Sequence, residues 1–458
     1  MRDPGTAIRA LEEELPGRVA TDPGAIAAVA HDASHLSATA AAVCRPADPD
    51  ELVRTVRWAR HYRVPLTARG AGTSLDGESV PAPGGVVVDL AAWSGILELD
   101  VVDRLVRVAP GTVNADLQAA LRPHGLFFPP NPGSWTTSTV GGNVATNASG
   151  PRSFRYGPTR AWVRAAEVVL GTGERLRIGG RAAKRSTGPD LVSLFVGSEG
   201  TLGVFTELTL ALAPLPARRT GLAVPLPADR PLGPIARALA AASGLGLSAV
   251  EYLDRGCADA LARVEGARLP SGHPLLLLEV ESGDEIEEHR RLEAVGARLA
   301  ELGIPEAPSV FPEADRLWTL RGHSGPVLDR TLGPRVREDV CVPLSGLDPM
   351  LEAIERAGRR AGVPVYLYAH LGQGSLHPNF AIDPSTPGAG RLREEILAEA
   401  LRLGGTVSGE HGIGRLKRSF LAAEIGDGGV QLLRALKRAC DPDGILNPGA
   451  LLPPTGAP

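Results

Sequence analysis

Arg69-Gly-Ala-Gly-Thr-Ser74 is a glycine-rich loop that directly follows the short apolar segment Val64–Ala68. The apolar segment predicts a strand, and the loop after it offers closely spaced backbone N–H groups and two hydroxyl side chains. Such loops bind phosphate because their N–H groups converge on an anion. The loop is not a Rossmann fingerprint, since Leu75 stands at the third glycine position, and no Gly-Lys pair follows to make a Walker A loop. By itself it fits a structural turn as well as a phosphate site.

Further glycine-rich stretches lie downstream of this loop. The chain between Gly133 and Gly150 is rich in Gly, Asn, Thr and Ser, and Gly197-Ser-Glu-Gly-Thr-Leu-Gly203 is a third such stretch. We expect the region from Gly133 to Gly150 to be a long loop, and long loops are uncommon in compact domains unless they bind something. Together the three stretches predict a large ligand with a pyrophosphate, such as a dinucleotide.

The segments around these stretches predict β-rich α/β structure with short connections. Acidic residues at the start of one segment, Asp48 or Asp50, are suitable N-caps for an amphipathic helix that ends near Tyr62. Other helices are expected at 5–14, 23–30, 113–121 and 190–195, and further strands at Val86–Leu90, Arg104–Val108, Ala165–Gly171, Arg175–Ile178 and Val204–Ala211.

A change of composition marks a domain boundary near Pro214-Leu-Pro216, with more prolines between 225 and 234. Beyond this boundary, alanine- and arginine-rich segments alternate with expected strands such as Leu275–Val280 and Asp339–Pro343. That alternation is typical of an α+β domain with an antiparallel sheet.

Bulk composition excludes several classes of protein. The 458 residues suffice for two or more domains, and 43% hydrophobic with 22% charged residues is ordinary for a globular protein. A net charge of −4 gives no reason to expect nucleic acid or an anionic membrane as the main partner. The four cysteines are too far apart for a disulfide framework, a zinc knuckle or an iron–sulfur cluster. Without an apolar signal core or a membrane-length apolar run, we expect a cytoplasmic protein.

Histidines and a glutamate form a second chemical feature in the C-terminal half. Two short strands are expected around a loop at Gly372–Ser375, which would pair His370 with His377. Opposed residues in an antiparallel pair lie close enough for two imidazoles to share a cation. Farther along, Ser408-Gly-Glu-His-Gly412 places a carboxylate and an imidazole between glycines. Two histidines and a glutamate leave metal positions open for substrate, although a buried histidine pair and a solvated Glu-His loop are the alternatives.

The order of these motifs resembles the vanillyl-alcohol-oxidase flavoprotein superfamily. The C-terminal half resembles its FAD-linked oxidase branch, which includes cytochrome-linked D-lactate dehydrogenases, the D-type subunit of glycolate oxidase and D-2-hydroxyglutarate dehydrogenase. The motifs that carry the resemblance are Arg69–Ser74, Pro132–Ser134, Val140–Asn143, Thr146–Gly150, Gly197–Gly203 and Ser408–Gly412, within residues 30 to 450.

The resemblance implies an α+β fold with a two-subdomain FAD-binding domain of the vanillyl-alcohol-oxidase/PCMH type. It also implies an α+β cap domain with a ferredoxin-like antiparallel sheet and a C-terminal helical segment. The implied divisions are an N-terminal helical segment at 1–38, the FAD-binding domain at 39–216, the substrate or cap domain at 217–420, and a segment at 421–458 that returns to the flavin domain.

Cofactor contacts are implied by matching the motifs residue by residue. FAD should be noncovalent, because the loop from Arg69 to Gly77 contains neither His nor Cys. The implied FAD contacts are Arg69, Gly70, Ala71, Gly72, Thr73 and Ser74 at the pyrophosphate, Pro132, Gly133, Ser134, Thr139, Gly141, Gly142, Asn143, Thr146 and Gly150 along the flavin, Glu199, Gly203 and Val204 on the nucleotide side, and Asn447 where the C-terminus returns.

The same resemblance assigns the histidine motifs. It implies that a divalent metal, zinc or manganese, is bound by His370, His377 and Glu410, and that His411 is the general base for the substrate hydroxyl. The implied substrate contacts are Arg321, Arg337 and Asn379. The chain departs from its relatives at three places: Arg337 replaces a usual Lys, Gly372-Gln-Gly-Ser375 replaces Gly-Asp-Gly-Asn, and Gly325 replaces a substrate-contacting Thr of the hydroxyglutarate enzyme.

These observations predict a flavin- and metal-dependent dehydrogenase that oxidises D-lactate, glycolate, D-2-hydroxyglutarate or a related D-2-hydroxy acid to the 2-oxo acid. Electrons would pass to an external cytochrome, quinone or electron-transfer flavoprotein, in the cytoplasm or peripherally at the inner membrane, and a homodimer is compatible with the sequence. The alternatives are a catalytic flavin subunit of a glycolate-oxidase-like complex and a non-flavin metalloenzyme with a two-histidine-one-carboxylate set. A non-redox lipid synthase on the same fold is disfavoured by the hydroxy-acid motifs.

Overall fold

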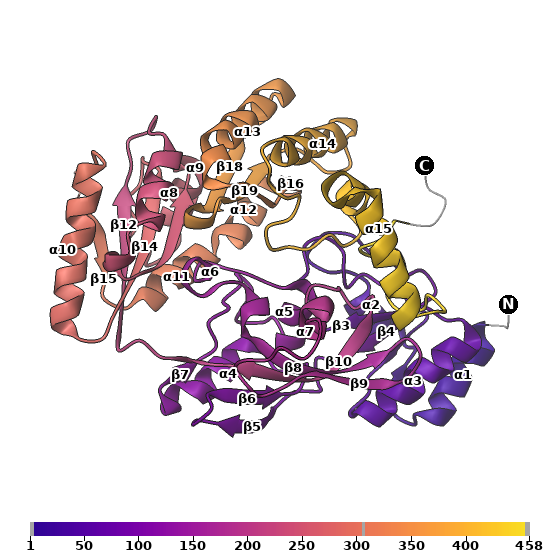
Figure 1. Cartoon of the computed structure of the whole chain (residues 1–458). Coiled ribbons are helices and arrows are strands. Elements are labelled where there is room, and N and C mark those ends of the chain that lie inside the picture. Colours follow the sequence, from indigo (N-terminus) through magenta and orange to yellow (C-terminus); the bar gives the residue numbers. More distant parts are fainter. Residues whose placement is uncertain (1–3, 305–306, 454–458) are drawn as a thin grey trace. The chain divides into compact units, whose positions relative to one another are not determined.

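The computed structural model describes residues 4–304 and 307–453, and Figure 1 shows their arrangement. The chain divides into two compact units. Unit 1 consists of residues 1–149, 158–215 and 410–458, and unit 2 consists of residues 150–157 and 216–409. Each unit combines helices with its own sheets, so the predicted α+β class is confirmed.

Unit 1 contains a four-stranded sheet in the order β1-β2-β4-β3, in which β2, β4 and β3 run parallel. Its strands are short valine- and alanine-rich runs buried on both faces, as expected for parallel strands covered by helices. Asp48 caps the main covering helix by accepting a hydrogen bond from the Glu51 N–H at 2.8 Å. The elements are α1 (Pro4–Glu14), β1 (Val19–Ala20), α2 (Pro23–Val29), β2 (Ala42–Cys44), α3 (Pro49–Tyr62), β3 (Leu66–Arg69) and β4 (Val86–Asp89).

A five-stranded antiparallel sheet in the order β5-β6-β10-β8-β9 forms the second layer of unit 1. Its inner face packs Val106, Val168 and Leu208 against short helices, and all three side chains are fully buried. The elements are β5 (Ile96–Asp100), β6 (Leu105–Val108), α4 (Asn114–Leu121), α5 (Val140–Thr146), β8 (Val163–Leu170), β9 (Arg175–Gly179), α7 (Leu191–Phe195) and β10 (Gly203–Ala211), with a small pair formed by β7 (Leu126–Phe127) and β11 (Ala213–Pro214).

The C-terminal segment completes unit 1. Helix α15 (Leu421–Cys440) is interrupted at Gly426, whose φ of 71° lies outside the helical region. After α15 the chain lies beside β3, because the Leu66 N–H donates to the Ile445 carbonyl and the Asn447 N–H donates to the Leu66 carbonyl, each at 2.7 Å. Residues from the two ends of the sequence therefore share one core.

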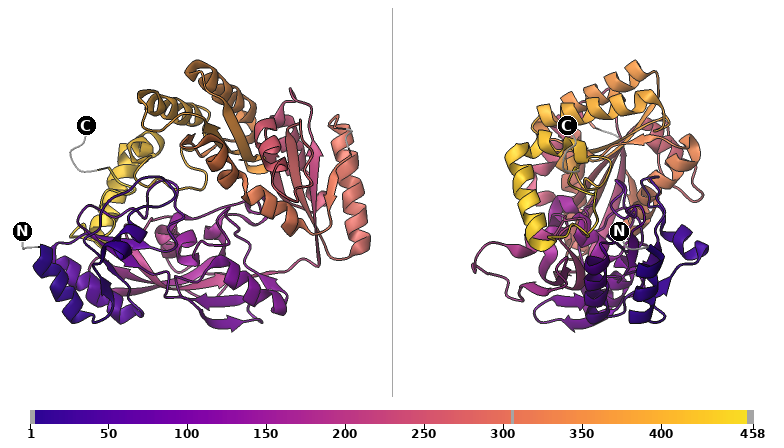
Figure 2. Two further views of the ribbon diagram at one scale, coloured as in Figure 1. Left: turned by 180° about the vertical axis from the view of Figure 1, so that it is seen from behind. Right: turned by 90° about the vertical axis from the view of Figure 1, so that its right-hand side faces the viewer.

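Unit 2 is built on an eight-stranded sheet in the order β15-β12-β14-β13-β18-β19-β16, with β17 also paired to β19. Helix α10 (Glu285–Glu301) packs against β14, as the views of Figures 1 and 2 show. The strands are β12 (Arg218–Pro225), β13 (Leu247–Leu253), β14 (Leu275–Ser282), β15 (Ser309–Phe311), β16 (Val336–Arg337), β17 (Val340–Cys341), β18 (Val365–His370) and β19 (Ser375–Phe380). The remaining helices include α6 (Ser153–Tyr156), α8 (Leu232–Ala240), α9 (Arg255–Ala262), α11 (Ala314–Gly322), α12 (Ser324–Leu332), α13 (Leu347–Ala361) and α14 (Pro387–Arg402).

Glu251 and Glu279 are fully buried acidic residues on the core face of the unit 2 sheet. Side chains alternate along a strand, so Glu251 shares the face of Leu253 in β13, and Glu279 shares the face of Leu277 in β14. Leu253 and Leu277 pack against α9, α11 and α12 in the unit 2 core. Both glutamates are 0% exposed. Their hydrogen-bond partners therefore decide how two charges are accommodated inside this unit.

Most predicted elements around the glycine-rich stretches are confirmed within one or two residues, including β4, β9, α3 and α4. One expectation was wrong: residues 140–146 form the helix α5 and not a loop. Thr139 begins this helix as its N-cap, and its hydroxyl accepts from the Gly142 N–H at 3.2 Å. The helix could not be predicted because it contains two consecutive glycines, and glycine has a low intrinsic helix propensity. Among the described residues, no helix is long and apolar enough to cross a membrane.

Candidate functional site

The first glycine-rich loop lies against the second one inside unit 1. Arg69 ends β3 and is almost buried, and its Nη1 donates to the His31 carbonyl at 2.8 Å. A Cβ on Gly70 would overlap the side chain of Thr139, and a Cβ on Gly72 would overlap the guanidinium of Arg69. Glycine is required at both positions because the backbone approaches these side chains closely.

Buried donors without partners lie where the glycine-rich stretches meet. The Nδ2 of Asn143 and the Oγ of Ser138 have no hydrogen-bond partner among the described residues, although both atoms are buried. Buried polar groups are normally hydrogen-bonded, so unsatisfied donors in one place indicate a ligand. Pro132 is buried nearby in sequence, and a Cβ on Gly133 would meet nothing within 4 Å, which leaves that backbone open to a ligand.

The third glycine-rich stretch is fixed to α5 by backbone hydrogen bonds. The Gly197 N–H donates to the Val144 carbonyl at 3.0 Å, and the Glu199 N–H donates to the Ala145 carbonyl at 2.8 Å. Glu199 has a φ of 54°, in the left-handed region. The Asn447 amide donates to the backbone carbonyl of Glu199 at 2.9 Å. The predicted cofactor residues of unit 1 are thus joined by α5 and the C-terminal segment.

Other predicted cofactor residues have ordinary structural contacts. Thr146 donates its hydroxyl to the Gly142 carbonyl at 3.2 Å. Gly203 and Val204 begin β10 and pair with residues of β8. Gly150 belongs to unit 2 and not to unit 1.

A cluster of buried acids that the sequence did not reveal follows the loop from Arg69 to Ser74. Glu199 accepts hydrogen bonds from the Ile413 and Gly414 N–H groups at 2.7 and 2.9 Å, and burial raises its pKa to about 7. Burial, then the charge of Glu199, raise the pKa of Glu78 well above its usual value. Lys417 is also buried and its Nζ lies 3.2 Å from the Asp76 carboxylate. The cluster fixes the segment after His411, because it holds two of its backbone N–H groups.

The histidine hairpin of unit 2 has a different register from the one predicted. His370 pairs with Ser375, and Tyr368 pairs with His377, because the connection is the short helical turn 371–373 followed by Gly374. The predicted pairing of His370 with His377 was therefore wrong. The shift is two residues along the partner strand, and side chains alternate with a period of two, so both histidines stay on one face. Their ring centroids lie 5.0 Å apart.

Each histidine of the hairpin has a buried carboxylate beside its Nδ1. His370 Nδ1 lies 2.6 Å from Glu251 Oε1, which is hydrogen-bonding distance. His377 Nδ1 lies 3.7 Å from Asp339 Oδ1, which is an ion-pair distance only. Arg321 holds the other oxygen of Glu251 through its Nε and Nη2, at 3.1 and 3.0 Å. Sequence reasoning missed Glu251, although a glutamate between apolar residues on the core face of a strand was the available signal.

Glu410 is the first residue of the C-terminal segment of unit 1, whereas His370 and His377 belong to unit 2. Each of these three side chains offers one atom that can bind a metal ion. Imidazole nitrogens and a carboxylate oxygen suit zinc or manganese. His411 comes next in the chain, and its Nε2 lies 3.9 Å from the Glu410 carboxylate.

The predicted substrate residues already have partners within unit 2. Arg337 of β16 pairs in register with Asn379 of β19. The side-chain Oδ1 of Asn379 accepts from Nε of Arg335 at 2.9 Å. Arg335 is only 2% exposed, and no sequence motif distinguishes it from Arg337. Arg321 bonds Glu251 and its guanidinium lies over the Tyr368 ring at 4.5 Å.

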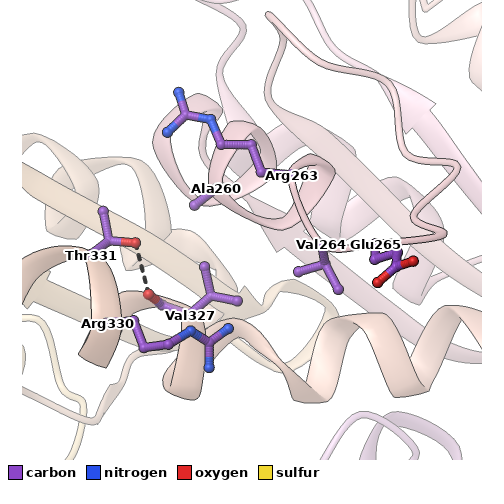
Figure 3. A pocket seen from close by; sticks show the side chains of 7 residues that line it. All are labelled: Ala260, Arg263, Val264, Glu265, Val327, Arg330 and Thr331. Carbon is purple, nitrogen blue, oxygen red and sulfur yellow. Dashed lines mark hydrogen bonds between the residues drawn. The ribbon is translucent and has the colours of Figure 1, made fainter.

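A separate hollow of about 370 Å³ opens on unit 2 (Figure 3). It lies between the end of α9 and α12, where the Thr331 hydroxyl donates to the Val327 carbonyl. None of the predicted site residues line it; its lining residues are Ala260, Arg263, Val264, Glu265, Val327, Arg330 and Thr331.

Comparison with known structures first defines the class of the fold. The p-cresol methylhydroxylase structure with substrate bound matches 98% of this chain and 97% of its own, with a TM-score of 0.80 at 16% sequence identity. At that identity the match shows the fold alone, which is that of the vanillyl-alcohol-oxidase/PCMH flavoproteins.

Sequence comparison then defines the family. Residues 40–179 match the FAD binding domain, and residues 215–451 match the C-terminal domain of FAD linked oxidases. Glycolate oxidase subunit GlcD of Bacillus subtilis (strain 168) is 34% identical over 418 residues, which are 90% of this chain and 88% of that protein. D-lactate dehydrogenase of Archaeoglobus fulgidus is 33% identical over 422 residues, which are 90% of this chain and 91% of that protein. This chain belongs to the FAD-linked oxidase family and is an FAD-dependent oxidoreductase.

The residues of unit 1 fit FAD. The buried Asn143 amide and Ser138 hydroxyl offer hydrogen-bonding groups without partners among the described residues, next to the glycines of α5. An isoalloxazine ring carries several acceptors of hydrogen bonds, so these donors suit it. The alternative of a non-flavin metalloenzyme is wrong, because the chain carries an FAD binding domain.

Proposed function

We propose that this protein is a D-2-hydroxy acid dehydrogenase that requires noncovalent FAD and a divalent cation. The observation that carries the proposal is the pair of buried histidines His370 and His377 in unit 2, whose ring centroids lie 5.0 Å apart. The pair occurs in a chain that also carries Glu410 and His411, whose family is FAD-linked and whose relatives include a D-lactate dehydrogenase and a glycolate oxidase subunit.

The proposed reaction removes a hydride from the C–H bond of the substrate and a proton from its hydroxyl group. FAD supplies the oxidant, since a bound flavin accepts a hydride. A divalent cation on His370, His377 and Glu410, zinc or manganese, would lower the pKa of the substrate hydroxyl. His411 is the general base that takes the hydroxyl proton at its imidazole, because histidine exchanges protons near neutral pH.

Substrate orientation is proposed to come from Arg321, Arg337 and Asn379. A 2-hydroxy acid carries a carboxylate, and arginine binds carboxylates through two parallel N–H groups. Arg337 Nη1 lies 4.0 Å from the Asp329 carboxylate, at the outer limit of an ion pair. Arg321 already bonds Glu251, so we propose that it contributes positive charge near the carboxylate end.

Flavin reduction tests the reaction and its substrate class. Anaerobic addition of D-lactate, glycolate or D-2-hydroxyglutarate to the FAD-bound, metal-replete protein should bleach the flavin absorption near 450 nm, the usual position of this band to within about 10 nm. Removal of the cation with a chelator should stop the bleaching, and re-addition of zinc or manganese should restore it. A metal-replete protein that is bleached by no member of a broad 2-hydroxy acid panel would overturn the proposal.

Substitution of His411 tests the proton acceptor. His411→Ala should retain the flavin absorption spectrum but slow reduction by about 10²- to 10⁴-fold, the usual contribution of a general base. His289→Ala is the matched control, since this histidine lies on α10 with a side chain that is 78% exposed, and it should reduce at the rate of the unsubstituted protein. Unchanged reduction in His411→Ala would remove His411 as the base.

The second candidate is a catalytic flavin subunit within a larger complex. It is favoured by the relative from Bacillus subtilis, whose name is that of a subunit of glycolate oxidase. We propose an external cytochrome, quinone or electron-transfer flavoprotein as electron acceptor, in the cytoplasm or at the inner membrane surface. Turnover of the isolated chain with an artificial dye distinguishes the candidates, because a chain that needs other subunits only for electron transfer will reduce the dye alone.

A further inference from the structure

The carboxylate of Glu251 fixes which nitrogen of His370 carries a proton. Glu251 Oε1 lies 2.6 Å from Nδ1 of His370, both side chains are buried, and Glu251 is 0% exposed. An ionised carboxylate only accepts hydrogen bonds, so in a neutral His370 imidazole the proton is on Nδ1 and Nε2 keeps its lone pair. A cation binds a histidine through such a lone pair, and the partner of the other nitrogen sets the orientation of the ring.

Arg321 in turn fixes Glu251. Its Nε and Nη2 donate to Oε2 of Glu251 at 3.1 and 3.0 Å, so the two oxygens of the carboxylate serve different partners. The guanidinium of Arg321 also lies over the Tyr368 ring at 4.5 Å. The Tyr368 ring in turn lies beside His377, with 5.1 Å between ring centroids. Arg321 therefore supports both histidines of the hairpin, one through Glu251 and the other through Tyr368.

Glu279 lies on the same face of the same sheet and has a different role. Its carboxylate accepts from Arg219 at 2.8 Å, from the Ser248 hydroxyl at 2.7 Å, from Arg152 at 3.3 Å and from the Trp318 indole. All of these partners only hold the carboxylate in place, and none of them is a candidate ligand. Glu279 is therefore a matched structural control for Glu251.

We propose that Glu251 and Arg321 are positioning residues that hold His370 in the Nδ1–H tautomer, which makes Nε2 the ligand atom for a divalent cation. This inference rests on the proposed function for its use in catalysis, but the tautomer itself can be measured without metal and without turnover. It also gives Arg321 a second role, in which it acts on His370 through Glu251.

The variant Glu251→Gln should invert the tautomer. Arg321 has only donors, so the amide oxygen of the new glutamine must face Arg321. Its NH₂ group then faces Nδ1 of His370, which has to become an acceptor, and the proton moves to Nε2. Adding Arg321→Met to Glu251→Gln removes the donor that forces this orientation of the glutamine amide. The double variant should therefore recover the Nδ1–H tautomer of His370.

The experiment uses the FAD-bound protein after removal of metal with a chelator and selective ¹⁵N labelling of histidine. Long-range ¹H–¹⁵N correlation spectra identify the His370 tautomer, with His370→Gln to assign its signals, and titration calorimetry with Zn²⁺ or Mn²⁺ alone measures affinity. We expect the Nδ1–H tautomer in the unsubstituted protein and in Glu279→Gln, and inversion in Glu251→Gln. We also expect Glu251→Gln to weaken cation affinity by about 10- to 100-fold, the usual effect of losing such a partner.

Two results would overturn the inference. One is an Nε2–H tautomer of His370 in the unsubstituted metal-free protein, a measurement that needs no variant to fold. The other is a Glu251→Gln protein that keeps both the Nδ1–H tautomer and the full cation affinity. If the unsubstituted protein shows the Nδ1–H tautomer but binds neither cation, the proposed function fails while the tautomer assignment stands, so the two failures are distinguishable.

Discussion

Two pairs of buried acids, one pair in each unit, are accommodated in different ways. In unit 2, Glu251 and Glu279 each face arginine side chains within hydrogen-bonding distance. In unit 1, Glu78 and Glu199 are near each other, and the charge of Glu199 is one of the causes that raise the pKa of Glu78. Oε1 of Glu78 has no hydrogen-bond partner in the part of the chain that the structure describes.

This difference shows two solutions to one physical problem. Burying an ionised carboxylate is costly unless a counter-charge accompanies it, and otherwise the group is protonated instead. Arginines supply counter-charges to Glu251 and Glu279, so these glutamates can act as fixed acceptors, and Glu251 can orient a histidine. The surroundings of Glu78 and Glu199 favour protonation, and burial gives Glu199 a pKa of about 7. Acids of the first kind organise side chains, whereas acids of the second kind respond to pH.

The largest expected loss of stability comes from removing an acidic side chain of unit 2 that is paired with arginines. Glu279→Leu removes the carboxylate that Arg152 and Arg219 share, and Asp315, which is 57% exposed, is a second carboxylate 3.5 and 3.0 Å from these arginines. Breaking a buried pair from one side costs about 3–5 kcal/mol, and Asp315 should keep the loss near the lower limit. Urea denaturation combined with hydrogen–deuterium exchange of β14 peptides measures this loss within unit 2. A loss no greater than that of Glu279→Gln would contradict the importance of the charge.

Ion pairs between buried side chains could not be predicted from the sequence, although the glycine-rich motifs could. Arg69–Ser74 and Gly197–Gly203 were identified because a ligand loop concentrates its glycines in a short stretch. Arg152 and Glu279 are 127 residues apart, and no local pattern joins them. The predicted register of the hairpin was wrong for a related reason. Glycines at 372 and 374 allowed two loop positions, and only the packed structure selects one.

Glu78→Gln is expected to change stability by less than Glu279→Leu and in the opposite direction. A raised carboxyl pKa means that the folded state binds its proton more tightly than the unfolded state. Stability is therefore highest below the ordinary pKa of about 4.5 and falls as the pH rises through the folded value. The groups near Glu78 are Asp76, Glu199, Asp32, Lys417 and Arg415, and the three acids among them act in the same direction.

Glutamine at position 78 stays neutral at every pH and so avoids this loss. We expect Glu78→Gln to raise the free energy of unfolding at pH 8 and to give no gain near pH 4, because burial and the neighbouring charges raise the pKa of the Glu78 carboxyl in the folded state. Urea denaturation at the two pH values, with saturating FAD, measures the difference. Equal effects of the substitution at pH 4 and pH 8 would show that Glu78 does not titrate in the folded protein.

The smallest effect on stability should come from breaking an ion pair on the surface of unit 1 that is similar in length to the Arg219–Glu279 pair. Arg181 lies 2.7 Å from Glu98, much as Arg219 lies 2.8 Å from Glu279, but both partners at the surface are exposed. Hydrogen bonds from Arg107, then Arg181, lower the pKa of Glu98, so any stability they add is present above its ordinary pKa and lost as the pH falls. Water and salt screen exposed pairs, so Arg181→Ala should be indistinguishable from the unsubstituted protein in urea at pH 7 and at pH 3. If Arg181→Ala lost as much stability as Glu279→Leu, distance and not burial would decide the value of a pair, and the contrast between the two units would lose its physical basis.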